Sequence, residues 1–141
     1  MSDAARRMLL AILLLGVVGI TAELLLLAHT EDIDQWIPIA LAGMTIVLST
    51  VVALRPTPGL LRIFQVVMVL MILSGALGMY LHLSANMEFQ LEMDATLKGF
   101  ALLKKSIVAK SPPALAPGAM AQLGLIGLAY TYKHPVLGRQ I

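Results

Sequence analysis

An all-α fold, a four-helix transmembrane bundle, is predicted for this chain by its segmentation and its composition. Four long apolar stretches, separated by short charged segments, fill most of the 141 residues. The composition is 59% hydrophobic and 13% charged, whereas soluble domains carry about 25% charged residues. Each stretch has about the length, roughly 20 residues, that a helix needs to cross a bilayer. Backbone polar groups in lipid must be satisfied internally, so such stretches form helices.

The first predicted span covers residues 8–29 and is apolar apart from Thr21 and Glu23. It follows Arg6-Arg7, as the core of a secretory signal would. The run is longer than a typical signal core, and no A-x-A cleavage site closes it. We therefore expect an uncleaved first helix.

The other predicted spans cover residues 36–54, 62–82 and 113–132. Together with the first span they form a single polytopic membrane domain, residues 1–141. Trp36 opens the second span, where an interfacial indole is favoured. Pro38 lies in its first turn, where the missing N–H costs little. Pro56–Gly59 predicts a tight turn before the third span. Several prolines predict a stiff entry to the fourth span.

A longer outer loop is predicted between helices 3 and 4, over residues 84–111. Its first half is acidic, and its second half, residues 95–110, mixes lysines with apolar side chains. Leu97, Phe100 and Ile107 share a helical face, but Lys104 falls within their arc. The pattern leaves open whether an interfacial helix forms there.

The basic residues predict that both termini lie in the cytoplasm, an N-in/C-in orientation, because Lys and Arg accumulate on the inner side. Six would lie there, close to the ends of the spans, against four lysines in the outer loop. The inner residues are Arg6, Arg7, Arg55, Arg62, Lys133 and Arg139.

The cysteine count and the net charge exclude some classes of function. The chain has no cysteine, which excludes disulfides, thiolate metal sites and cysteine nucleophiles. The net charge of +2 is too small to predict a nucleic-acid partner. No nucleophile–base arrangement, phosphate-binding loop or catalytic carboxylate pair stands out, so the pattern leans against an enzyme and gives no catalytic residue.

Glu23 is the ionisable residue of the first span, and such groups in lipid usually face protein or water. It shares a helical face with Gly16 and Gly19, whose small size lets a second helix approach. We expect an intramembrane polar contact between Glu23 and a neighbouring helix. The alternatives are a solvated or snorkelling carboxylate, since Glu23 lies within about two turns of the outer surface, and a proton or cation relay.

A metal site at the outer rim is the second hypothesis. His29 and His82 end the first and third spans, which run in the same direction, and acids surround them. Imidazole with carboxylate suits a divalent metal ion, with Glu88 and Glu92 as further candidate ligands. Adjacent placement of the two spans would bring the imidazoles together, and diagonal placement would separate them. Two histidines at matching depth also leave a haem or pigment site as a third possibility.

Small residues predict tight helix packing in the third and fourth spans. Ser74 and Gly78 have small-xxx-small spacing, which lets helix backbones approach closely in lipid. The fourth span is small on several sides and includes Gly124. The residues predicted to pack are Gly16, Gly19, Gly78 and Gly124.

Three segments resemble a group of small, uncharacterised bacterial four-span membrane proteins. They are Ala22–His29 with Gln35–Pro38, Asn86–Asp94, and Ala114–Pro135. The resemblance implies four helices and a multi-pass location in the bacterial cytoplasmic (inner) membrane. It implies no function.

The expected function is that of a non-catalytic accessory or assembly subunit of a larger membrane complex. Small-residue helix faces favour it, since they suit packing on other helices. The expected partners are membrane lipid and other membrane subunits or a second copy, and no nucleic acid. The identity of any cofactor is left unknown, a divalent metal ion being favoured over haem.

Overall fold

The structure, a computed structural model, is helical throughout its regular elements and describes residues 1–27, 33–109 and 115–138. Along the chain its elements are α1 (Asp3–Leu26), the 3₁₀ turn η1 (Ile33–Gln35), α2 (Trp36–Leu54), α3 (Pro58–Met93), α4 (Gly99–Ile107) and α5 (Leu115–Thr131). The predicted all-α class is confirmed for the described residues, which contain no strand.

Side-chain caps fix where two of the long helices begin. The Ser2 hydroxyl accepts a hydrogen bond from the Ala5 N–H at 3.3 Å, and this satisfies a free donor at the start of α1. Thr57 does the same for α3 through the Leu60 N–H, also at 3.3 Å. Pro58 follows Thr57 at the first helical position, where no N–H is needed.

Among the described residues, three helices are long and apolar enough to cross a membrane, namely α1, α2 and α3. The fourth apolar helix, α5, is shorter at 17 residues. Many large apolar side chains of these helices are exposed, among them Leu15, Leu26 and Leu54 at 77–85%. Such an outward apolar surface is costly in water and natural in lipid. The structure therefore supports a membrane protein.

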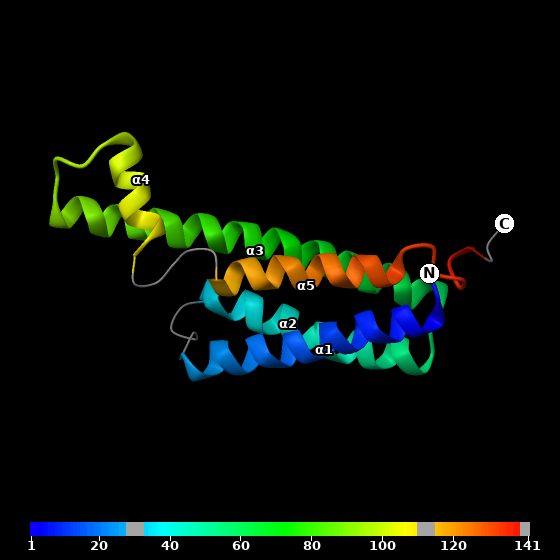
Figure 1. The fold of residues 1–141 in the computed structure, drawn as a ribbon. Coiled ribbons are helices and arrows are strands. Elements are labelled where there is room, and N and C mark those ends of the chain that lie inside the picture. Colours follow the sequence, from blue (N-terminus) through cyan, green and yellow to red (C-terminus); the bar gives the residue numbers. More distant parts are fainter. Residues whose placement is uncertain (28–32, 110–114, 139–141) are drawn as a thin grey trace.

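The four long helices lie side by side and close into a ring in the order α1, α2, α3, α5 (Figure 1). α1 packs on α2 and α5, and α3 packs on the same two helices. Among the described residues α1 and α3 do not pack on each other, so they occupy diagonal positions. The start of α1 and the segment after α5 lie at the end of the bundle opposite α4.

The seam between α3 and α5 is the most extensive and joins the two backbones closely. A Cβ atom placed on Gly124 would lie 2.6 Å from the Met68 carbonyl oxygen of α3. One placed on Gly75 would lie 2.5 Å from the Pro117 carbonyl oxygen of α5. Only glycine permits this approach, which resembles the small-residue packing of helices in lipid. Gly78 also faces Pro117, with a contact at 3.1 Å.

The core contains a buried polar pair on α2. The Thr45 hydroxyl donates to its own helix at the Leu41 carbonyl, 2.8 Å away, and lies 3.0 Å from the Met71 sulfur of α3. Ser49, one turn later, is fully buried, and its hydroxyl has no hydrogen-bond partner in the described part of the chain. Both side chains turn into the bundle rather than toward lipid.

The prediction of an outer loop over residues 84–111 is wrong for the first half of that segment. α3 does not end near residue 82 but continues to Met93, so the acidic segment is helical. The helix has no proline or glycine between Gly78 and Met93 to stop it. It ends at Asp94, whose carboxylate accepts hydrogen bonds from the Thr96 N–H and hydroxyl at 3.0 and 2.6 Å. The loop's second half contains α4, packed against α3.

Candidate functional site

A polar site lies at the end of the bundle where the start of α1 meets the segment after α5. Arg6, in the second turn of α1, is 5% exposed. Its Nη1 donates to the carbonyls of Tyr130 and Tyr132, at 3.0 and 3.1 Å, and its Nη2 donates to that of Lys133 at 2.7 Å. These carbonyls lie at or beyond the end of α5, where the helix leaves acceptors unsatisfied and favours a cation. Arg6 thus caps α5 from another helix.

A turn after α5 folds the chain back over this end of the bundle. Lys133 takes a positive φ of 47°, a conformation that reverses the chain direction. The His134 N–H then donates to the Thr131 carbonyl at 3.1 Å. The His134 carbonyl in turn accepts from Leu137 at 3.0 Å. This short network places the His134 ring in the bundle.

The His134 ring is buried against an aromatic row that runs inward from it. Its centre lies 5.5 Å from that of Tyr130, which meets Phe64 of α3 edge-on at 5.8 Å. The ring Nδ1 accepts a hydrogen bond from the Val136 N–H at 3.3 Å, so the neutral ring carries its proton on Nε2. Burial lowers the pKa of His134 below its ordinary value, and the charge of Arg6 lowers it further, against an opposing effect of Asp3. The imidazole is therefore neutral at pH 7.

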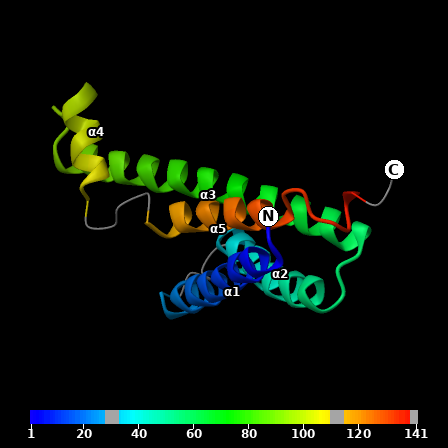
Figure 2. The same cartoon turned by 45° about the vertical axis from the view of Figure 1, so that its right-hand side comes forward.

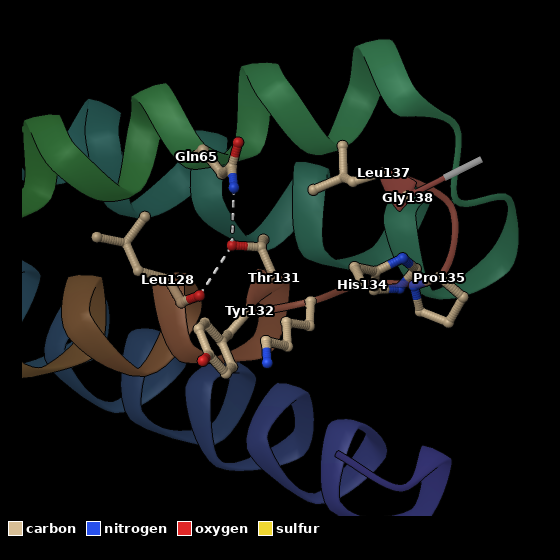
Figure 3. Close-up of a pocket in the computed structure, with 9 residues that line it drawn as sticks. Gln65, Leu128, Thr131, Tyr132, His134, Pro135, Leu137 and Gly138 are labelled. Carbon is tan, nitrogen blue, oxygen red and sulfur yellow. Dashed lines mark hydrogen bonds between the residues drawn. The ribbon is translucent and has the colours of Figure 1, made fainter. Parts of the chain in front are cut away.

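An open groove of about 620 Å³ lies between the start of α3 and the turn after α5 (Figure 3). On its floor the Gln65 amide donates to the Thr131 hydroxyl at 3.0 Å, which donates to the Leu128 carbonyl at 2.8 Å. The Lys133 ammonium lies 5.5 Å from the centre of the Tyr132 ring. The groove is lined by Gln65, Leu128, Thr131, Tyr132, Lys133, His134, Pro135, Leu137 and Gly138.

The groove continues into a second, more apolar one of about 350 Å³ along α3. Gln65 lines both grooves, and Arg62 lines the second beside Val66, Val69 and Leu70. Polar and cationic groups therefore meet exposed apolar side chains at one end of the bundle. An amide, an ammonium and a guanidinium can bind a polar or anionic headgroup, while the apolar part suits a hydrocarbon chain.

The predicted outer metal ligands do not come together in the described residues. His82, Glu88 and Glu92 are all exposed on α3. Because α3 is one continuous helix, Glu88 is turned about 240° from His82 around the axis. His29 lies outside the described residues. The diagonal placement of α1 and α3 removes the adjacency on which the pairing of His29 with His82 depended.

No group of three His, Cys, Asp or Glu side chains that could hold a metal ion occurs in the described ranges. The same diagonal placement removes the geometric reason for a haem shared between α1 and α3. The identity of any cofactor therefore stays unsupported by this fold.

The predicted packing face of α1 is divided in two. A Cβ atom on Gly16 would meet the Leu123 side chain of α5, so this glycine lies in a helix seam. Gly19 has open space around it, and Glu23 is exposed. α1 and α5 run antiparallel, with Arg6 near Tyr130 and Gly16 near Leu123. This register brings Glu23 level with the first turn of α5, where the covering helix begins. No contact between Glu23 and a second helix of this chain is described.

Sequence reasoning used Arg6 only in the signal-like Arg6-Arg7 start and in the count of inner cations. One signal could have identified its role. Arg6 precedes Leu10, Leu13 and Val17 by four, seven and eleven residues, and these three are core residues of α1. The helical period therefore carries the core face back to Arg6. A cation on a core face must find acceptors, and the end of an antiparallel helix supplies them.

Comparison with known proteins found no matching family, no matching curated protein and no matching solved structure. The function is therefore argued from the geometry of this chain.

Proposed function

We propose that this chain is a non-catalytic, multi-pass protein of the bacterial cytoplasmic membrane. It crosses the bilayer four times and serves as an accessory or assembly subunit. The observation that carries this proposal is the outward flank of α1, defined as Gly19 and Glu23 with the neighbouring Leu15 and Leu26. Gly19 has open space, and the other three side chains are exposed.

Glu23 is the reason to expect a partner at this flank. The helical rise places it about 26 Å beyond Arg6 along α1, inside a hydrocarbon core of about 30 Å. Side chains of this kind in a span usually pair with protein or line a water-filled cavity. Within the chain, Glu23 faces outward. A helix from another subunit, or from a second copy, would supply the missing hydrogen-bond donor.

Gly16 shows how closely a helix approaches α1 on the same side. A Cβ atom placed on it would contact the end of the Leu123 side chain of α5, which would have to shift. Gly19, one turn further on, has open space among the described residues and offers the same access. A second helix can therefore approach the backbone of α1 there and reach Glu23.

The fourfold crossing is supported by the two ends of α5. Arg6 holds the end of α5 near the start of α1, while Pro117 near its beginning contacts Gly75, well along α3. α5 thus extends beside the helices that are long enough to span, although it is itself shorter.

Photo-crosslinking in intact membranes tests the assembly role. A photoreactive residue replaces Leu15 or Leu26 on the outward flank, or the exposed Val47 of α2 as the control. We expect one crosslinked protein product of definite mass from positions 15 and 26 and none from position 47. Equal results from both helices, or no product at all, would contradict the proposal.

A pair of glycine variants separates assembly from folding. Gly19→Leu should abolish the crosslinked product but leave the thermal stability of the purified protein unchanged, since space is open at this position. Gly43→Leu on α2, where space is also open, should leave both unchanged. A product that survives Gly19→Leu would show that α1 is not the docking helix.

A further inference from the structure

α3 carries the chain beyond the hydrocarbon core at the end opposite the termini. Arg62 and Asn86 are 24 residues apart, which corresponds to about 36 Å along a straight helix. A hydrocarbon core is about 30 Å thick. With Arg62 at one boundary, Asn86 lies just past the other, at the depth of the lipid headgroups.

α4 is attached to α3 at this depth. The Asn86 amide donates to the Ser106 carbonyl at 3.1 Å, and the Ser106 hydroxyl bonds within α4 to the Leu102 carbonyl at 2.9 Å. Leu102 and Ser106 are buried against α3. Two views show α4 crossing α3, so that its axis lies across the direction of the bundle (Figures 1 and 2). In a membrane normal to the bundle, α4 is roughly parallel to the surface.

The rest of α4 divides into an apolar and a cationic side. Phe100, Leu103 and Ile107 fall within an arc of about 60° at 3.6 residues per turn, beside the edge that packs on α3. They are 78%, 36% and 48% exposed. Lys105 lies on the opposite side and is exposed, and the exposed Lys98 precedes the helix in extended backbone. This division is the pattern of a helix that lies in a membrane interface.

Lys104 borders the apolar arc, which made the pattern look incomplete in the sequence. A lysine at the edge of an apolar stripe is compatible with an interface, because its stem packs on apolar surface while its ammonium extends to phosphate. Carboxylates lie further out: Glu92 and Asp94 follow Asn86 by six and eight residues, or about 9 and 12 Å of helix rise. Glu92 and Asp94 thus lie beyond the headgroup depth at which α4 is attached, whereas Glu88, two residues after Asn86, lies close to that depth.

We propose that α4 binds the surface of an anionic bilayer. The apolar side, Phe100, Leu103 and Ile107, enters the boundary between headgroups and acyl chains. Lys104, at the border of the apolar side, contacts lipid phosphates, and Lys98 and Lys105 add positive charge near the anionic surface. The crossing of α4 over α3 makes this possible, because it turns one side of α4 toward the membrane and the other toward water. The α3–α4 hairpin then binds lipid at the membrane surface, in addition to connecting two helices.

Spin labelling in nanodiscs of defined lipid tests the proposal on the full chain, whose sequence has no cysteine to remove. Single cysteines at positions 100, 103 and 107 carry the label on the apolar side of α4. Those at 101 and 105 carry it on the other side, and that at 98 carries it just before the helix. We expect collisions with oxygen to dominate at the first three and collisions with a water-soluble nickel complex at the second three. Labels at Val47 and Ala95 give the lipid and water references.

Two results would overturn the proposal. One is nickel accessibility at positions 100, 103 and 107 equal to that at Ala95, which would place the apolar side in water. The other is immobile spectra there with spin–spin broadening that disappears on dilution with unlabelled chain, which would show that a second copy covers α4.

Lipid composition tests the charge contact separately. In nanodiscs with anionic lipid, the label at position 100 should lie deeper than in purely zwitterionic nanodiscs. The triple variant Lys98→Gln, Lys104→Gln, Lys105→Gln should lose at least half of that difference while the reference at Val47 stays unchanged. Equal depths in both lipids for the unaltered chain would overturn the assignment to anionic lipid.

Discussion

At the scale of single residues, Arg6 is the side chain that joins the two ends of the chain. Its three hydrogen bonds to carbonyls of residues 130, 132 and 133 cross 124 to 127 positions of sequence. Arg7, its neighbour, is exposed. Two identical residues therefore occupy opposite environments, because the helical period turns one into the core and the next toward the surroundings.

Arg6→Gln should destabilise the bundle by about 2 to 3 kcal/mol, since hydrogen bonds from a charged donor are worth roughly that much and three acceptors lose theirs. Arg7→Gln should change stability by less than about 0.5 kcal/mol, as exposed substitutions do. Unfolding of the purified protein by SDS titration measures both. Similar losses in the two variants would show that Arg6 contributes charge only.

His134 should make stability dependent on pH. In the fold its pKa is lowered below the ordinary histidine value of 6.5, by burial first and by the Arg6 charge second. Below pH 6.5 the histidine of the unfolded chain therefore binds a proton more readily than that of the folded protein. The free energy of unfolding should be highest above pH 6.5 and fall as the pH drops below it. Thermal unfolding between pH 5 and 8 tests this, with His134→Gln as the comparison. Subtraction of the two curves removes the contributions of other histidines, and equal slopes would refute the role of this ring.

At the scale of elements, the α3–α5 seam depends on glycines where the backbones meet. Gly124→Ala should destabilise the protein by about 1 to 3 kcal/mol, the range for overpacked interiors, because the new methyl would contact the rigid Met68 carbonyl. Gly43→Ala, in open space on α2, should be neutral or stabilising by up to about 1 kcal/mol, since alanine favours helix. The same SDS titration distinguishes them. A harmless Gly124→Ala would mean that the helices can separate there without loss.

The apolar helices could be predicted from the sequence, because an uncharged stretch of this length satisfies its backbone polar groups in lipid only as a helix. The second span was expected over 36–54 and α2 has those limits. The length of α3 was missed because apolarity marks where a membrane ends, whereas a helix ends only at a stop signal such as Asp94. Gly16 and Gly124 could be identified from small-residue spacing. Gly19 is equally small but does not make the contacts that Gly16 and Gly124 make, because residue type does not say which face of a helix a neighbour occupies.

At the scale of the whole molecule, the ring order α1, α2, α3, α5 determines which side chains can meet. Sequential antiparallel helices place α1 and α3 diagonally, so residues at their outer ends are separated by the bundle. The antiparallel pair α1 and α5 instead brings the N-terminal and C-terminal segments together. That pairing explains why a polar site forms at the end that holds Arg6, while His82, Glu88 and Glu92 are distributed around α3.

The topology is open to a direct test, because the sequence contains no cysteine. Single cysteines replace Ala4, Ala95 and Gly138, all exposed positions. Arg6 bonds the segment after α5 and so places residue 138 at the same end as residue 4, with residue 95 beyond the other end. A membrane-impermeant maleimide added to intact cells should therefore label position 95 alone, and positions 4 and 138 only after permeabilisation. Labelling of 4 and 138 with protection of 95 would reverse the orientation expected from the basic residues. Opposite behaviour of 4 and 138 would contradict the hydrogen bonds of Arg6 themselves.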